Sequence, residues 1–218
     1  MPIPLAAERS SLNYQEHPLL PNQRSLTEGK SKVELKIEEK KKRVSKTQLK
    51  YFVYSLRMKI RVGFGYDVHK LVAGRDLWIG GIKIDHESGL LGHSDADVLI
   101  HAICDALLGA ANMRDIGYHF PDTSADTLNI DSKILLKKTM ELVAAKGYEL
   151  GNIDATICAE RPKMNPHIPA MKQCLSTVMD CDIDDISIKA TTTEKLGFTG
   201  REEGISAYAT VLIYGGKR

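Results

Sequence analysis

Three side chains that can bind a divalent metal ion lie in two short stretches of the sequence. Asp67 and His69 stand two positions apart in GYDVHKL, a stretch next to apolar residues and typical of a β-strand. Alternate side chains of a strand share a face, so the pair should point one way and Val68 the other. His101 lies further on, in a segment with helical periodicity. Two neutral imidazoles and a carboxylate are typical of a catalytic site with an open fourth position, for which zinc is the favoured metal.

The helix predicted around His101 carries a polar stripe on an otherwise apolar surface. Ser94, Asp97, His101 and Asp105 recur at three- and four-residue spacing and so share one face. We expect Ser94 to cap the helix, with Asp97 completing a capping box. Asp97 or Asp105 would accept the second ring N–H of His101 and orient it. A surface histidine beside two carboxylates is the alternative, because spacing alone does not bring strand and helix together.

Two further segments carry groups that bind phosphate. GHSD, residues 92–95, begins the same helix, where free backbone N–H groups attract anions and His93 and Ser94 can add donors. Capping by Ser94 alone is the simpler interpretation. ATTTEKLGFTGR, residues 190–201, offers threonine hydroxyls for oxyanions and Glu194 for a hard cation such as magnesium, or it is a turn without a ligand.

Strand and helix patterns alternate along the chain from residue 59 onward. Strands are predicted over residues 60–68, 77–84, 152–160, 185–192 and 206–214, and helices over 94–112, 131–147 and 169–180. The polar segments 115–132, 159–169 and 193–204 are predicted to be loops. This alternation predicts the α/β class, as an α+β sandwich.

Composition and charge exclude several protein classes. The 218 residues suffice for one domain and an appendage. The sequence shows neither an apolar run long enough to span a membrane nor a secretory signal, so we expect a cytoplasmic protein. Residues 1–58 hold 12 basic and 6 acidic residues, against 18 and 22 in residues 59–218. We expect 1–58 to be a disordered or partly helical extension rather than an RNA-binding arm, and Met58 is a possible start. The four cysteines lack a C-x-x-C pair and should be reduced thiols.

Five segments together resemble the 2-C-methyl-D-erythritol 2,4-cyclodiphosphate synthases of the non-mevalonate isoprenoid pathway. They are GYDVHKL, GLLGHSDADVLIHAICDALLGAA, DIGYHFPDT, PKMNPHIP and IKATTTEKLGFTGR, and the resemblance covers residues 59–218 but not 1–58. It implies a homotrimer of subunits with mostly four-stranded sheets that carry helices on one face and surround a central axis, with active sites at subunit interfaces. The implied reaction, that of a phosphorus–oxygen lyase, converts 4-diphosphocytidyl-2-C-methyl-D-erythritol 2-phosphate to the cyclic diphosphate and CMP, with no nucleic-acid or membrane partner.

The resemblance also implies roles for individual residues. Asp67, His69 and His101 would bind zinc or manganese, His93 and Thr192 would steady the transition state, and Glu194 would help to hold magnesium on the diphosphate. Contacts to the methylerythritol phosphate would come from Ser94, Asp115, Ile116, Gly117, Phe120, Pro121, Asp122, Thr123 and Ser124. Contacts to the cytidine diphosphate would come from Ala159, Glu160, Arg161, Pro162, Lys163, Met164, Asn165, Thr191, Phe198 and Arg201, with Val68 and Thr193 completing the set.

One departure and two alternatives accompany this resemblance. Phe64 and Tyr208 stand where some members carry His and Glu at the trimer axis, which argues against an isoprenoid diphosphate in that channel. A metal-dependent phosphohydrolase would use the same three ligands to activate water and would give linear products. A metal-stabilised trimeric interaction module would need the metal for folding, and adding the substrate would change nothing.

Overall fold

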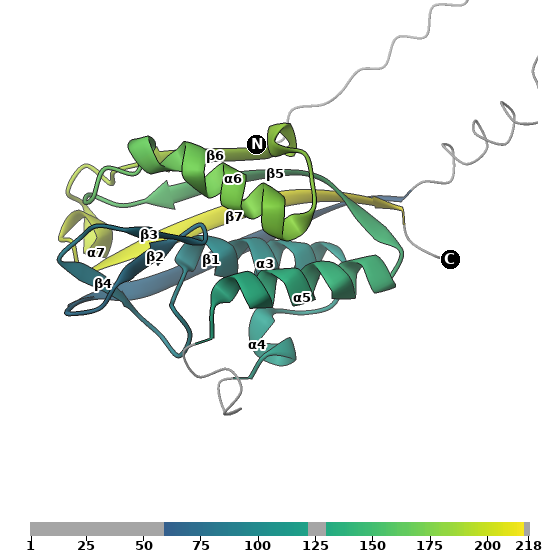
Figure 1. The fold of residues 1–218 in the computed structure, drawn as a ribbon, viewed down its shortest axis with the longest axis horizontal. Coiled ribbons are helices and arrows are strands. Elements are labelled where there is room, and N and C mark those ends of the chain that lie inside the picture. Colours follow the sequence, from purple (N-terminus) through teal and green to yellow (C-terminus); the bar gives the residue numbers. More distant parts are fainter. Residues whose placement is uncertain (1–58, 122–129, 216–218) are drawn as a thin grey trace, which may run out of the picture. The chain divides into compact units, whose positions relative to one another are not determined.

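A five-stranded sheet organises the residues that the structure, a computed structural model, describes: 59–121 and 130–215. Its order is β4-β1-β7-β5-β6, and only the β5–β6 pair is parallel (Figure 1). The strands are β1 (Lys59–Ala73), β4 (Ser88–Leu91), β5 (Tyr148–Cys158), β6 (Ile186–Thr191) and β7 (Gly204–Gly215). The α/β class is confirmed. The expectation of a mostly four-stranded sheet is wrong, because the sheet has a fifth, short strand, β4, which pairs only with the last four residues of β1.

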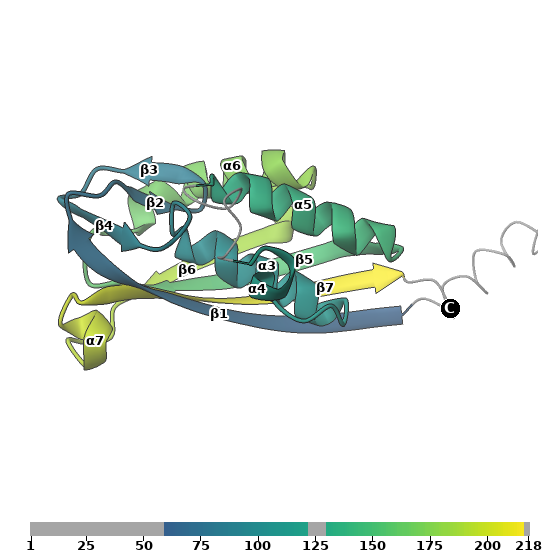
Figure 2. The same ribbon diagram turned by 90° about the horizontal axis from the view of Figure 1, so that it is seen from below.

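Three helices cover one face of this sheet. They are α3 (Val98–Ala110), α5 (Ser132–Ala145) and α6 (Ile168–Met179), and Figure 2 shows all three on the same side. The predicted strand 77–84 is instead a hairpin of β2 (Leu77–Ile79) and β3 (Ile82–Ile84), a separate two-stranded sheet. Single turns interrupt the three predicted loops: α4 (Ile116–His119), η2 (Asn165–His167) and α7 (Gly197–Gly200). A further turn, η3 (Ile183–Asp185), lies between α6 and β6. The core therefore lies between the sheet and the helices, with α3 at its centre.

Helix α3 lies directly against the backbone of β1. Gly63 and Gly65 are on the inner face of β1, and a Cβ at either position would collide with a backbone carbonyl oxygen of α3, that of Ala106 or Ala102. The absence of side chains at these two positions is what lets the helix approach. Since Ala102 follows His101, the same close approach carries that imidazole to β1.

The N-terminus of α3 differs from the prediction. Asp97, not Ser94, is the N-cap residue, and its carboxylate accepts the N–H of Ile100 at 3.0 Å. The same carboxylate accepts the N–H groups of Gly80 and Gly81, at 2.9 and 2.6 Å, from the β2–β3 turn. Asp97 is fully buried, and this burial raises its pKa although the three N–H groups act in the opposite direction. Asp97 thus links the β2–β3 hairpin to α3, which explains why this residue, and not Ser94, is the N-cap.

The other face of β1 is apolar and uncovered by α3, α5 or α6 (Figure 2). Ile60, Val62 and Phe64 are each more than 60% exposed, at 63, 64 and 64%. Tyr66 and Tyr208 continue the patch, with ring centroids 4.8 Å apart. Such a contiguous apolar surface is typical of a protein–protein interface.

Helix α5 and the cysteines also follow the sequence predictions. The helix predicted from Asp131 is confirmed, with Asp131 as its N-cap. The four cysteines are free thiols, as expected. No helix in the described ranges is long and apolar enough to cross a membrane. The N-terminal extension 1–58, with Met58, and the expected substrate contacts Asp122, Thr123 and Ser124 lie outside the described residues.

Candidate metal centre

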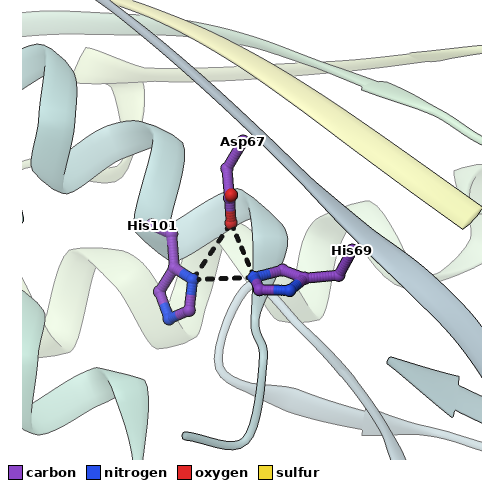
Figure 3. Close-up of side chains that lie close together, drawn as sticks. All are labelled: Asp67, His69 and His101. Carbon is purple, nitrogen blue, oxygen red and sulfur yellow. Dashed lines mark hydrogen bonds and ion pairs between the residues drawn. The ribbon is translucent and has the colours of Figure 1, made fainter. Parts of the chain in front are cut away.

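Asp67, His69 and His101 converge, as the sequence predicts. Figure 3 shows the two side chains of β1 and the imidazole of α3 pointing toward one another. The Oδ2 atom of Asp67 lies 2.9 Å from Nε2 of His69 and 3.0 Å from Nδ1 of His101, and the two nitrogens are 3.1 Å apart. Strand alternation places the first two on one face, and the two glycines of β1 let the third reach them.

The outer nitrogen of His69 has a fixed partner. Its Nδ1 lies 2.9 Å from the carbonyl oxygen of Leu91, at the end of β4. A carbonyl only accepts, so Nδ1 carries a hydrogen. In the neutral ring the Nε2 lone pair then faces the other two side chains, and in the protonated ring Nε2 donates to Asp67. Strand β4, which the sequence did not predict, therefore sets the tautomer of this histidine.

The outer nitrogen of His101 has partners that differ from the predicted ones. Its Nε2 lies 3.1 Å from Oγ of Ser94 and 3.0 Å from Oγ of Ser132. The expected orienting role of Asp97 or Asp105 is wrong: Asp97 is committed to its three N–H groups, and Asp105 accepts the N–H of Ile116 at 2.8 Å. Ser132 was visible in the sequence only as part of a helix start, 31 residues from His101.

The charges of the three groups are strongly coupled. Burial alone would raise the pKa of Asp67, but hydrogen bonds from His101 and His69 hold it far below its ordinary value. Burial alone would lower the pKa of His101, whereas the hydrogen bond to Asp67 and its charge raise it overall. The carboxylate is therefore ionised near neutral pH and attracts positive charge, whether a proton on an imidazole or a metal ion.

The donor set fits a small divalent cation. One carboxylate oxygen and two imidazole nitrogens all lie within 4.8 Å of one another. Tetrahedral zinc with bonds of about 2.0–2.2 Å has neighbouring ligand atoms about 3.3–3.6 Å apart, a few tenths of an ångström wider than this triangle. A small outward movement of each side chain would seat the ion. The side chains are 24, 18 and 13% exposed, so a fourth ligand can reach them from outside.

A pocket of about 190 Å³ opens beside the three side chains. Besides them, its lining contains five residues that the resemblance singled out, namely His93, Ser94, Ile116, Gly117 and Phe120. Asp115 lies next to them as the N-cap of α4, and Val68 instead points to the opposite face of the sheet. Pockets that enclose a drug-sized ligand measure about 300–1,000 Å³, so this one accommodates only part of a nucleotide-sized molecule.

The residues predicted to contact the cytidine diphosphate lie in two loops, 159–165 and 191–201. Glu160 of the first loop holds the second, because its Oε1 accepts the backbone N–H groups of Thr193 and Lys195 at 3.0 and 3.2 Å. The hydroxyl of Thr192 donates to Glu194 at 3.2 Å, and Glu194 is exposed. Thr193 and Phe198 line a different pocket from the one beside Asp67. Within one chain the two pockets thus remain separate.

The other residues expected to contact the cytidine diphosphate differ in their exposure and in their ion pairs. Arg201 forms a two-point ion pair with Glu203, at 2.9 and 3.0 Å. Arg161 is exposed and lies 3.7 Å from Glu202. Exposed or partly exposed positions are Arg161, Pro162, Lys163, Asn165 and Thr191, whereas Ala159 and Met164 are buried.

Comparison with known proteins identifies the family. A family model described as the YgbB family matches residues 60–214. The chain belongs to the YgbB family. A 2-C-methyl-D-erythritol 2,4-cyclodiphosphate synthase of Bacteroides fragilis is 80% identical to it over 156 residues, which are 72% of this chain and 98% of that relative.

Two solved structures similar to this chain contain CDP. A synthase of the same name in a CDP-bound form is 37% identical, with a TM-score of 0.66, covering 70% of this chain and 99% of the other. A Plasmodium falciparum relative in complex with CDP is 35% identical with a TM-score of 0.64, covering 72% and 97%. The family model begins at residue 60, so residues 1–59 lie outside it.

Proposed function

We propose that the protein converts 4-diphosphocytidyl-2-C-methyl-D-erythritol 2-phosphate to 2-C-methyl-D-erythritol 2,4-cyclodiphosphate with release of CMP. The observation that carries this proposal is the convergence of Asp67, His69 and His101 beside a pocket, in a chain that spans 98% of a synthase to which it is 80% identical. The reaction belongs to non-mevalonate isoprenoid biosynthesis and makes the protein a phosphorus–oxygen lyase. A cytoplasmic location stays a prediction from the sequence.

The chemistry explains the residue types. The nucleophile is a phosphate oxygen, which is already ionised near neutral pH, so the reaction scarcely needs a protein base. Its difficulty is electrostatic, because one anion must attack another. A divalent ion held by Asp67, His69 and His101 would supply positive charge against that repulsion. His93 and Ser94 line the pocket beside the three ligands. We assign Ser94 to hold and orient the attacking phosphate, and His93 to steady the transition state.

We assign the Thr192–Glu194 pair to the diphosphate. The hydroxyl of Thr192 lies within hydrogen-bond distance of the exposed Glu194 carboxylate, so the two side chains already offer neighbouring oxygen ligands. Magnesium prefers such hard oxygen ligands together with phosphate oxygens. Thr192 would then donate to the oxygen on which charge builds during the reaction. The loop 159–165 and Thr191, Phe198 and Arg201 would hold the cytidine diphosphate, as a ligand of the kind present in the CDP-bound relatives.

We propose that the active enzyme is a homotrimer with the site at the subunit interface. Two features support this. The outer face of β1 exposes Ile60, Val62 and Phe64, which an interface would cover. The pocket beside Asp67 accommodates only part of the substrate, and Thr193 and Phe198 of the same chain, two of the predicted nucleotide contacts, line a different pocket. A neighbouring subunit would bring its own nucleotide loop to complete the site.

Phosphorus NMR of the purified protein tests this function. With the cytidyl substrate, zinc and magnesium, we expect the signals of a cyclic diphosphate and of CMP to appear together. A linear phosphate product would refute cyclisation and would instead indicate a phosphohydrolase. An unchanged substrate spectrum, with a protein that unfolds when its metal is removed, would indicate a purely structural metal site.

A further inference from the structure

A buried serine and an acidic residue stand behind His101, on the side away from Asp67. Ser132 is the first residue of α5 and is fully buried. Its Oγ lies 3.0 Å from Nε2 of His101 and also hydrogen bonds to Oδ1 of Asp95. None of these contacts follows from the polar stripe of α3, because Ser132 belongs to another helix.

The carboxylate of Asp95 determines how the Ser132 hydroxyl is oriented. It accepts the backbone N–H of Ser132 on Oδ2 at 3.0 Å, and the N–H of Asp97 at 3.3 Å on Oδ1. An ionised carboxylate can only accept, so the Ser132 hydroxyl donates its hydrogen to Asp95 and turns its lone pairs to His101. The Nε2 of His101 must then be the donor in that contact. In the neutral ring, Nδ1 is then left with a free lone pair, directed at Asp67 and His69.

Ser94 supports the same arrangement. Its Oγ accepts the N–H of Ala96 at 3.0 Å and lies 3.1 Å from Nε2 of His101, so it can accept the same ring hydrogen. Ser94 is free to rotate its hydroxyl hydrogen, whereas Ser132 is held by Asp95. The direction of the hydrogen bond is therefore set by the Ser132–Asp95 pair.

We propose that Asp95 and Ser132 are positioning residues that hold His101 in the tautomer whose Nδ1 can bind a divalent cation. This inference rests on the metal site proposed above. Groups of this kind orient the ring and raise its basicity, and their loss typically costs about 10–100-fold in metal affinity. The pair also anchors the start of α5 at the site, so a purely structural role must be separated from an effect on the metal.

The test is zinc affinity, measured by competition with a chelator on folded, metal-stripped protein. We expect S132A and D95N to bind zinc about 10–100-fold more weakly than the wild type and to alter the visible spectrum of the cobalt-substituted protein. The matched control is D131A, which removes the N-cap of the same helix, where Asp131 accepts the N–H of Lys133 at 2.9 Å, without touching His101. D131A should bind zinc like the wild type.

Three outcomes would overturn the inference. Equal zinc affinity in S132A and wild type would show that the serine does not position the ligand. An equal loss in D131A would assign the effect to the anchoring of α5. A wild-type protein that binds no zinc would remove the proposed metal site itself, a failure visible without any variant.

A measurement on the wild type covers the case in which the variants do not fold. In nitrogen–proton NMR spectra of the zinc-loaded protein, the Nε2–H of His101 should appear as a slowly exchanging signal, because its acceptor Ser132 is fully buried. Rapid exchange of that hydrogen with water would contradict the proposed hydrogen bond.

Discussion

Replacing Gly65 with alanine should push α3 away from β1 and open the metal site. The new Cβ would lie 2.7 Å from the backbone nitrogen of Ala106 and would collide with the carbonyl oxygen of Ala102. Both are helix backbone atoms, so the strain cannot be relieved by a side-chain rotation. Overpacking costs about 1–3 kcal/mol, and we expect about 3 kcal/mol here because the helix must move as a unit.

The same movement would separate the proposed ligands. His101 precedes Ala102, and its Nδ1 now lies 3.0 Å from Asp67. Metal–ligand distances tolerate deviations of only about 0.2 Å, so a displacement of His101 by a few tenths of an ångström should already weaken metal binding. We expect zinc affinity to fall by at least about tenfold, comparable with the loss of a supporting hydrogen bond.

Denaturant unfolding of the metal-stripped protein and zinc competition measure these two effects. Gly109 in the same helix provides the control, because a Cβ there would meet only the carbonyl oxygen of Phe64, at 4.0 Å. G109A should stabilise the protein by up to about 1 kcal/mol, as alanine favours helices, and should leave zinc affinity unchanged. If G65A were as stable as the wild type and bound zinc equally well, the close approach of helix and strand would not be what assembles the site.

Three further predictions concern the ligand, the interface and the thiols. H101A should lose high-affinity zinc binding and turnover while its circular dichroism spectrum remains that of the wild type; retained turnover would remove His101 from the ligand set. F64K, which places a charge on the apolar face of β1, should convert the proposed trimer into monomers in light scattering, and an unchanged mass would exclude that face from the interface. Burial raises the pKa of Cys104 to about 12, so at pH 8 its thiol stays protonated and should resist iodoacetamide in the folded protein but react after unfolding. Mass spectrometry of the alkylated peptides measures this, with the partly exposed Cys174 as the comparison.

Local patterns were sufficient to predict the elements that carry the candidate ligands. Strand alternation places Asp67 and His69 on one face, and helical periodicity places His101 on a polar stripe, because both depend only on near neighbours in sequence. Strand β4 escaped prediction because four residues are too few for a periodic pattern. Its carbonyl nevertheless holds His69.

Contacts between distant segments could not be predicted in the same way. Ser94 and Asp97 are both good N-cap residues, and the choice of Asp97 depends on the N–H groups of the β2–β3 turn. The sequence shows glycines at positions 63 and 65, but it does not show which helix packs against them, because that depends on tertiary packing. For the same reason no spacing rule connects Ser132 with His101.

Restoring metal to the stripped wild-type protein tests the central claim most directly. Cyclic diphosphate formation would be followed by phosphorus NMR in constant magnesium while zinc or manganese is added in steps. We predict that activity rises from near zero to a plateau at one added ion per chain, and that H101A shows no such rise. Full cyclisation by the stripped wild-type protein, without added zinc or manganese, would contradict the claim that Asp67, His69 and His101 form the electrostatic centre of the reaction.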